Sequence, residues 1–165
     1  MAGELSHTIV EQITHIEFNF NGGEIPQHKR RNNIMGNRAV IVMESEYDEP
    51  IENCVAIYLH WNGGRDSVES FLETAKHFNL RGGDYGIARL VQIICNFMKG
   101  TLSVGVGLYK YQDTNNWDNG VYVIDNEFNI VDRLYKKSSE QNEYDTKEFV
   151  ADLIEQNSMM ESAYS

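Results

Sequence analysis

The 165-residue chain lacks most features of secreted and membrane proteins. It holds only two cysteines, Cys54 and Cys95, and both lie in apolar surroundings, which predicts buried free thiols. No apolar run reaches membrane-spanning length, and residues 1–11 lack the apolar core of a secretory signal. The expected location is therefore a reducing cytoplasm, without contact with a membrane.

Positive charge is also scarce, with 14 Lys and Arg against 25 Asp and Glu and a net charge of -11. Binding to DNA or RNA needs clustered basic residues, so we expect no direct nucleic-acid binding. The only basic run, Lys29–Arg31, is too short to change this expectation. An acidic surface instead favours a basic protein or a ribonucleoprotein as partner. Solubility alone is the alternative interpretation of the charge.

Apolar periodicity divides the chain into three parts. Residues 1–37 form a polar N-terminal segment with a candidate strand at Thr14–Phe20, residues 38–156 form one domain, and residues 157–165 form a flexible tail. Strands and helices are segregated along the chain. This order predicts an α+β domain with a mostly antiparallel sheet of about five strands packed against two central helices, plus a short C-terminal helix. The predicted strands cover 38–43, 53–60, 101–111, 121–125 and 130–135.

Three aspartates are predicted to cap the helices. Asp66 and Asp145 are each followed three residues later by a glutamate, as in a capping box, and Asp84 follows a Gly-Gly pair. The strand at 101–111 contains Gly105 and Gly107, which indicate a bulge or a close approach of the backbone.

Two corners of similar composition are candidate ligand sites. In each, a Gly-Gly pair and an arginine precede a helix, whose exposed N–H groups favour anions. If both corners face the same side, their arginines form one basic pocket for a nucleotide or another anion. The alternative is that the glycines only make tight turns. The candidate ligand-binding residues are His60, Trp61, Asn62, Gly63, Gly64, Arg65, Arg81, Gly82, Gly83 and Arg89.

Two acidic segments are candidate partner-binding sites. Residues 44–52 carry five carboxylates in nine residues, and residues 113–132 are also rich in aspartate. Trp117 lies in the turn sequence NNWDNG, and an exposed tryptophan is typical of protein interfaces. Folding back of Trp117 over the sheet edge is the alternative. The candidate partner-binding residues are Glu44, Glu46, Asp48, Glu49, Glu52, Asp113, Trp117 and Asp118.

Motifs for catalysis and for cofactors are absent from the sequence. There is no P-loop, no dinucleotide fingerprint, no Gly-x-Ser-x-Gly and no His or Cys pair at metal-ligand spacing. We therefore predict no cofactor, no metal and no catalytic residue, and an enzyme that uses His60 as acid or base is the minority hypothesis.

A resemblance to known proteins rests on four segments within residues 53–135: YLHWNGGRDSVESFL, RGGDYGIARLVQIICNFMKGTLSVGV, DNGVYVID and FNIVDRLY. They resemble a group of small acidic proteins from phages and other bacterial mobile elements. The resemblance implies no activity and no catalytic residue. It implies a protein of the host-cell cytoplasm that counters host defence, in the manner of an anti-CRISPR, by docking onto a nuclease or blocking its nucleic-acid channel.

Two hypotheses of different class follow. The first is a non-enzymatic interaction protein that inhibits a host defence nuclease or its complex through an acidic surface. The alternative is a protein that binds or sequesters a small ligand at the two Gly-Gly corners.

Overall fold

The protein is described by a computed structural model over residues 37–136 and 143–159, so the candidate strand at Thr14–Phe20 and the basic run Lys29–Arg31 lie outside the described residues. Within these ranges, no helix is both long and apolar enough to cross a membrane. The strands are β1 (Ala39–Met43), β2 (Val55–Leu59), β3 (Val104–Leu108), β4 (Val121–Ile124) and β5 (Ile130–Leu134). The helices are η1 (Ile51–Asn53), α2 (Arg65–His77), α3 (Gly83–Met98), η2 (Tyr109–Tyr111) and α4 (Lys147–Gln156).

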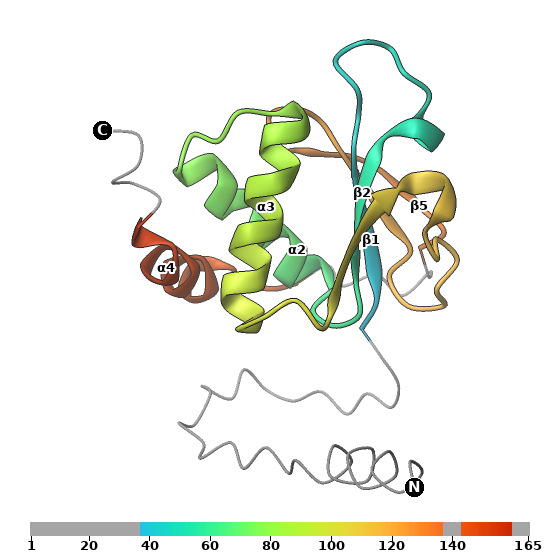
Figure 1. Cartoon of the computed structure of the whole chain (residues 1–165). Coiled ribbons are helices and arrows are strands. Elements are labelled where there is room, and N and C mark those ends of the chain that lie inside the picture. Colours follow the sequence, from blue (N-terminus) through green and yellow to red (C-terminus); the bar gives the residue numbers. More distant parts are fainter. Residues whose placement is uncertain (1–36, 137–142, 160–165) are drawn as a thin grey trace, which may run out of the picture. The chain divides into compact units, whose positions relative to one another are not determined.

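The five strands form one sheet in the order β3-β2-β1-β4-β5, with β1 at its centre (Figure 1). β1 pairs antiparallel with β2 on one side and parallel with β4 on the other, and the remaining pairs are antiparallel. The α+β class and the mostly antiparallel sheet are thereby confirmed. The parallel pair of β1 and β4 was not predicted, because a pattern of period two shows that a strand exists but not which strand it meets.

The two faces of the sheet carry separate apolar clusters. Ala39, Ile41 and Met43 of β1 face the helices and pack in a core with Phe71 of α2 and Leu90 of α3. α4 packs mainly on α2, at the outside of this layer (Figure 1). This arrangement confirms the predicted packing of the sheet against two central helices, with a short C-terminal helix beside them.

The opposite face of the sheet is covered by η1, η2 and loops instead of long helices. Val40 and Val42 of β1 pack there with Cys54, Tyr109 and Val121. Because both faces of β1 are covered, its five residues are at most 4% exposed. Burial on both faces explains why the sequence of β1 is a continuous apolar run instead of an alternation of apolar and polar residues.

β3 is shorter than the strand predicted at 101–111, because Tyr109–Tyr111 turn into η2. Only Gly107 marks a close approach, which is one of the two predicted alternatives. A Cβ at Gly107 would lie 2.9 Å from Nε2 of Gln112, whereas one at Gly105 would make an ordinary contact at 3.5 Å with Cβ of Tyr58. Gly107 therefore makes room for the side chain of Gln112.

All three predicted helix caps differ in detail from the observed ones. α2 begins at Arg65 rather than after Asp66, and Glu69 does not reach back to the N-cap but accepts a hydrogen bond from Nε of Arg65 at 2.7 Å. α3 begins at Gly83, whose N–H donates to Oδ1 of Asn126 at 2.8 Å rather than to Asp84. At the third, the N-cap of α4 is Thr146 instead of Asp145, although Oδ1 of Asp145 accepts from N–H of Lys147 at 3.0 Å.

Asn157, which was predicted to begin a flexible tail, is instead buried at the end of α4. Asn157 is 1% exposed, and its Oδ1 accepts a hydrogen bond from Nδ2 of Asn96 at 2.7 Å. Its own Nδ2 donates to the carbonyl of Leu153 at 2.8 Å. Asn157 therefore ends α4 by joining it to α3.

Substitution of Gly63 tests the packing of the first Gly-Gly corner against β1. A Cβ at this position would lie 2.6 Å from both Cβ of Ala39 and the carbonyl oxygen of Asn37, so either the turn or β1 must shift. We expect Gly63→Ala to lower the free energy of unfolding by about 1–3 kcal/mol. Gly105→Ala is the control, because its added Cβ meets only ordinary contacts. Urea denaturation measures both, and equal small effects would contradict the packing described here.

Candidate functional site

The two Gly-Gly corners lie at opposite ends of β1. At the first corner, N–H of Gly63 donates to the carbonyl of Asn37, just before β1, at 2.7 Å. At the second, N–H of Gly83 lies 3.2 Å from Sδ of Met43, the last residue of β1. The whole length of α2, about 20 Å for a 13-residue helix, separates the two corners. They therefore do not combine into one anion pocket.

The arginines of the two corners are also engaged separately. Arg65 pairs with Glu69, and this hydrogen bond raises the pKa of the guanidinium above its usual value. Arg81 and Arg89 both lie beside the ring of Tyr85, with Cζ at 5.5 and 5.9 Å from its centroid. Within residues 37–136 and 143–159, the three arginines thus do not meet in one basic pocket. Packing explains each Gly-Gly pair, because Gly63 lies against Asn37 and Gly82 against Asn126.

His60 and Trp61 are exposed at the rim of the first corner, and Asn62 beside them is half-buried. The His60 ring packs edge-on against Trp61 at 5.0 Å between centroids, and Nδ2 of Asn62 lies 3.5 Å from Sδ of Met98. In the described part of the chain, no carboxylate hydrogen-bonds to the His60 ring. The partner that orients a catalytic histidine is thus not seen among these residues.

The described residues offer neither a cluster of metal ligands nor a reactive thiol. Over residues 37–136 and 143–159, no group of three or more His, Cys, Asp and Glu side chains is placed to hold a metal ion. Both cysteines are free. Burial raises the pKa of the Cys54 thiol, and nearby Glu49 and Glu44 raise it further. Burial also raises the pKa of the Cys95 thiol, so both favour the protonated, unreactive form.

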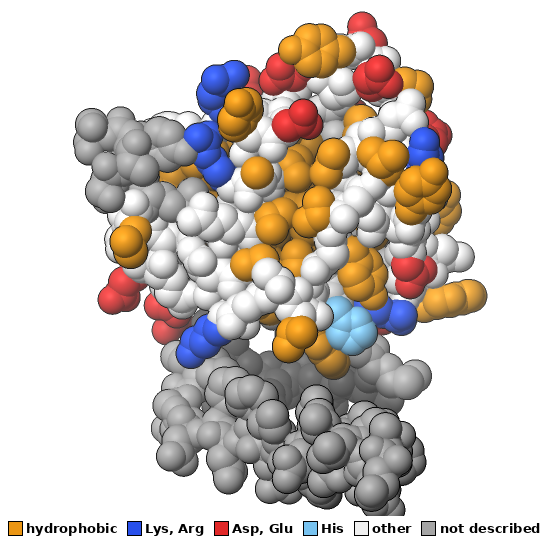
Figure 2. Space-filling model, in the orientation of Figure 1, with side chains coloured by type: hydrophobic (Ala, Val, Ile, Leu, Met, Phe, Trp, Pro, Cys, Tyr) orange, Lys and Arg blue, Asp and Glu red, His pale blue; other side chains and the backbone are white. Residues whose placement is uncertain are grey.

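The acidic loop between β1 and β2 is exposed and surrounds a hollow. All five of its carboxylates are exposed, and Figure 2 shows acidic side chains gathered around this loop at the top of the view. The hollow has a volume of about 370 Å³, and Tyr47 beside it is 85% exposed. It is lined by Glu44, Ser45, Asp48, Glu49, Ile51 and Cys54.

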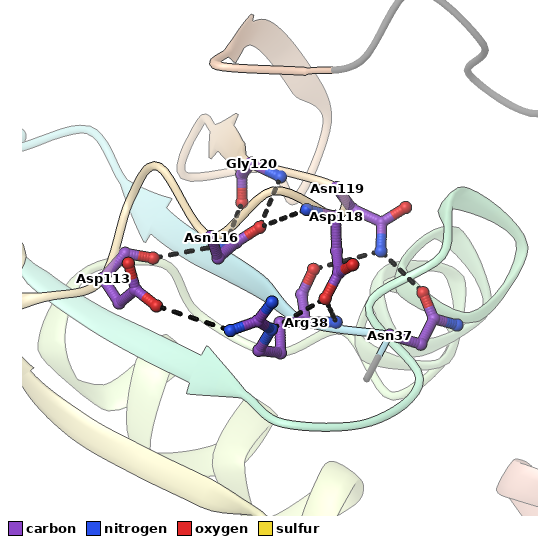
Figure 3. Close-up of polar contacts among 7 residues, drawn as sticks. All are labelled: Asn37, Arg38, Asp113, Asn116, Asp118, Asn119 and Gly120. Carbon is purple, nitrogen blue, oxygen red and sulfur yellow. Dashed lines mark hydrogen bonds and ion pairs between the residues drawn. The ribbon is translucent and has the colours of Figure 1, made fainter. Parts of the chain in front are cut away.

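The loop before β4 is held by one buried amide. The side chain of Asn116 is 1% exposed and makes four hydrogen bonds within the loop (Figure 3). Its Nδ2 donates to the carbonyls of Asp113 and Gly120 at 3.2 and 3.3 Å. Its Oδ1 accepts from the N–H groups of Asp118 and Gly120, both at 3.1 Å. Every polar atom of this amide is satisfied, which fixes the loop between Asp113 and Gly120.

An ion pair joins this loop to the start of β1. Oδ2 of Asp118 accepts from Nε of Arg38 at 2.7 Å and from its backbone N–H at 3.2 Å (Figure 3). The hydrogen bond to Asp118 raises the pKa of Arg38 above its usual value. Nδ2 of Asn119 adds bonds to Oδ1 of Asn37 at 2.6 Å and to the carbonyl of Arg38 at 3.0 Å.

Trp117 is the exposed aromatic residue of this loop. Its side chain is 73% exposed, and its backbone has φ of 62°, a left-handed conformation that is uncommon for an aromatic residue. Such a conformation persists only where the surrounding contacts determine it, and its neighbours Asn116 and Asp118 supply those contacts. The predicted exposure of Trp117 is therefore observed, and the alternative of folding back over the sheet edge is wrong.

The acidic loop and the Trp117 loop lie on the same side of the sheet. We name this side the loop face, made of residues 44–54 and 109–120. η1 and η2 contact one another there, and Nζ of Lys110 donates to Oδ1 of Asn53 at 3.2 Å. Figure 1 shows these segments beside the sheet, on the side away from α2 and α3. The two candidate segments, some 60 residues apart in sequence, lie on one side of the sheet but at opposite ends of β1. The acidic loop follows Met43, and the Trp117 loop is tied to Arg38.

The loop face changes the roles predicted for some residues. Asp118, a candidate for partner contact, is only 16% exposed in its side chain and instead positions the loop through Arg38. Asp113 remains 56% exposed, with its Oδ2 at 3.9 Å from Arg38. Tyr111, 78% exposed, was not predicted as a contact because it fell within the strand predicted at 101–111.

No family model, curated protein or solved structure matches this chain. The functional interpretation therefore rests on the sequence and on the geometry of the described residues.

Substitution of Asn116 tests whether its buried side chain holds the loop before β4 in place. We expect Asn116→Ala to lower the free energy of unfolding by about 1–3 kcal/mol, because it leaves buried N–H and C=O groups without partners. The matched control is Asn115→Ala, at the exposed neighbouring position, with an expected change within about 0.5 kcal/mol. Urea denaturation followed by circular dichroism gives both values. Similar values for the two variants would show that the amide does not hold the loop.

Proposed function

We propose that this protein is a non-enzymatic binding protein that docks its loop face onto a basic surface of another protein or ribonucleoprotein. The observation that carries the proposal is Trp117, exposed on a loop whose backbone conformation is fixed by buried polar contacts. A rigid, exposed tryptophan loses little conformational freedom on binding, and tryptophan is enriched among residues that dominate interface energy.

The other exposed side chains of the loop face support a cationic partner. Tyr47 and Tyr111 are also exposed on the loop face, together with the five carboxylates of the acidic loop and Asp113. Aromatic faces attract arginine and lysine side chains, and carboxylates pair with them. The hollow beside Tyr47 combines carboxylates with the apolar side chains of Ile51 and Cys54, which suits the charged end and the aliphatic stem of such a side chain.

The resemblance to small acidic proteins of phages and mobile elements supports a partner in host defence. A nuclease needs a basic surface to hold nucleic acid. An acidic protein docked on that surface excludes the substrate by occupying the same positive charges. The net charge of -11 supports this mechanism, since it favours association with a basic surface and disfavours any direct contact with nucleic acid.

Trp117→Ala tests the anchor. We expect immobilised full-length protein to capture a basic partner from a bacterial host lysate, and the variant to bind that purified partner at least ~30-fold more weakly, the effect of losing about 2 kcal/mol. Trp61→Ala is the matched control, since Trp61 is an exposed tryptophan outside the loop face, and its affinity should equal that of the wild type. Equal affinity of the two variants would contradict the proposed anchor.

Removal of charge from the acidic loop tests the electrostatic contribution to partner binding. The triple variant Glu46→Gln, Asp48→Asn and Glu49→Gln should slow association by roughly tenfold at low salt and lose most of that difference near 1 M salt, where screening acts within about 3 Å. Surface plasmon resonance with the captured partner measures both rates. An association rate that does not depend on salt or on these charges would contradict a basic docking surface. The matched control removes three charges from α4, by Glu148→Gln, Asp152→Asn and Glu155→Gln.

A further inference from the structure

The outer edge of β3 has backbone groups that no strand of the described residues covers. β3 pairs with β2 on one side only and ends the sheet. The hydrogen bonds from His60 to Ser103 and from Tyr109 to Cys54, both 2.9 Å, show that the odd-numbered residues of this segment direct their backbone groups to β2. By the alternation of an antiparallel ladder, Val104, Val106 and Leu108 direct theirs outward. The N–H of Val104 donates there to the carbonyl of Thr101 at 3.1 Å, so its carbonyl and the groups of Val106 and Leu108 are the ones left for a second strand.

This edge also lacks the features that usually prevent pairing with another chain. Residues 101–109 contain no charged residue and no proline, and the pairing of β3 with β2 shows no register shift. Val106 is 56% exposed and Leu102 is fully exposed. Figure 2 shows hydrophobic side chains across the middle of the face that holds α3 and β3, with acidic side chains at its margins.

The edge is complementary to itself. In an antiparallel pair of two β3 strands centred on Val106, Val104 lies opposite Leu108 of the second copy, and Gly105 lies opposite Gly107. The apolar side chains of both copies then share one side of the joined sheet, and the glycines share the other. Lys110 would lie opposite Leu102, so no two like charges meet in an otherwise strongly acidic protein.

We propose that the outer edge of β3 is a self-association site, at which a second copy of the chain pairs antiparallel through Val104–Leu108 around a two-fold axis at Val106. The two five-stranded sheets become one continuous sheet, and of the loop face only its first residues, around Lys110, lie beside the second copy. A single strand pair is a small interface, so the dimer forms in a concentration-dependent manner. This inference does not depend on the proposed function, because it uses a different surface.

Sedimentation equilibrium of the full chain tests the proposal. The wild-type mass should rise with concentration from 19.0 kDa toward twice this value. Val106→Lys places two like charges at the axis and should lower the association constant at least tenfold. The matched control is Val131→Lys, on β5 at the other edge, where valine is 49% exposed. It should associate as the wild type does. A wild type that stays monomeric at every concentration, or equal association of the two variants, overturns the proposal.

Disulfide trapping tests the same axis without relying on the folding of Val106→Lys. Opposite residues of a hydrogen-bonded antiparallel pair have Cα atoms about 5.5 Å apart, which a disulfide can span. In a chain whose two native cysteines are replaced by serine, Val106→Cys should form a disulfide-linked dimer on mild oxidation, and Val131→Cys should do so at least tenfold more slowly. Equal rates of cross-linking overturn the symmetric pairing.

Discussion

The ion pair between Arg38 and Asp118 is the contact on which the loop face depends. It joins the residue before β1 to the loop that leads into β4, at the end of the sheet where these two parallel strands begin. A parallel pair has no hairpin to set its start, so contacts between the preceding segments must do this. The buried amide of Asn116 closes the loop behind Asp118 and leaves its backbone few alternatives. Trp117 stands between these two fixed residues, which accounts for its unusual backbone conformation.

The two faces of the sheet carry two different kinds of surface. The helices cover one face of the sheet with a large apolar core, and the other face is covered by short loops that carry carboxylates and exposed aromatic side chains. Loops on a rigid sheet can vary in sequence without loss of the fold. Charge on these loops accelerates the approach of a basic partner, and Trp117 supplies the short-range contact energy once the surfaces meet.

The sequence predicted the parts of the fold that depend on neighbouring residues, and missed those that depend on distant ones. Apolar periodicity located the five strands and three helices, because each buries one face. It could not show that β1 meets β4, or that Asn126, 43 residues further along the chain, caps α3. The glycines of the first corner looked like a ligand site for the same reason, since their contact with Asn37 is visible only in the structure. Trp117 was predicted as a candidate from its turn sequence, but Asp118 beside it gave no local sign of its bond to Arg38.

Hydrogen–deuterium exchange of the protein with and without its captured partner tests the central claim most directly. The account predicts that partner binding slows exchange in residues 44–54 and 109–120, which form the loop face, and leaves exchange in α2 and α4 unchanged. Protection confined to the helices, with no change in either loop-face segment, would contradict the assignment of the binding surface.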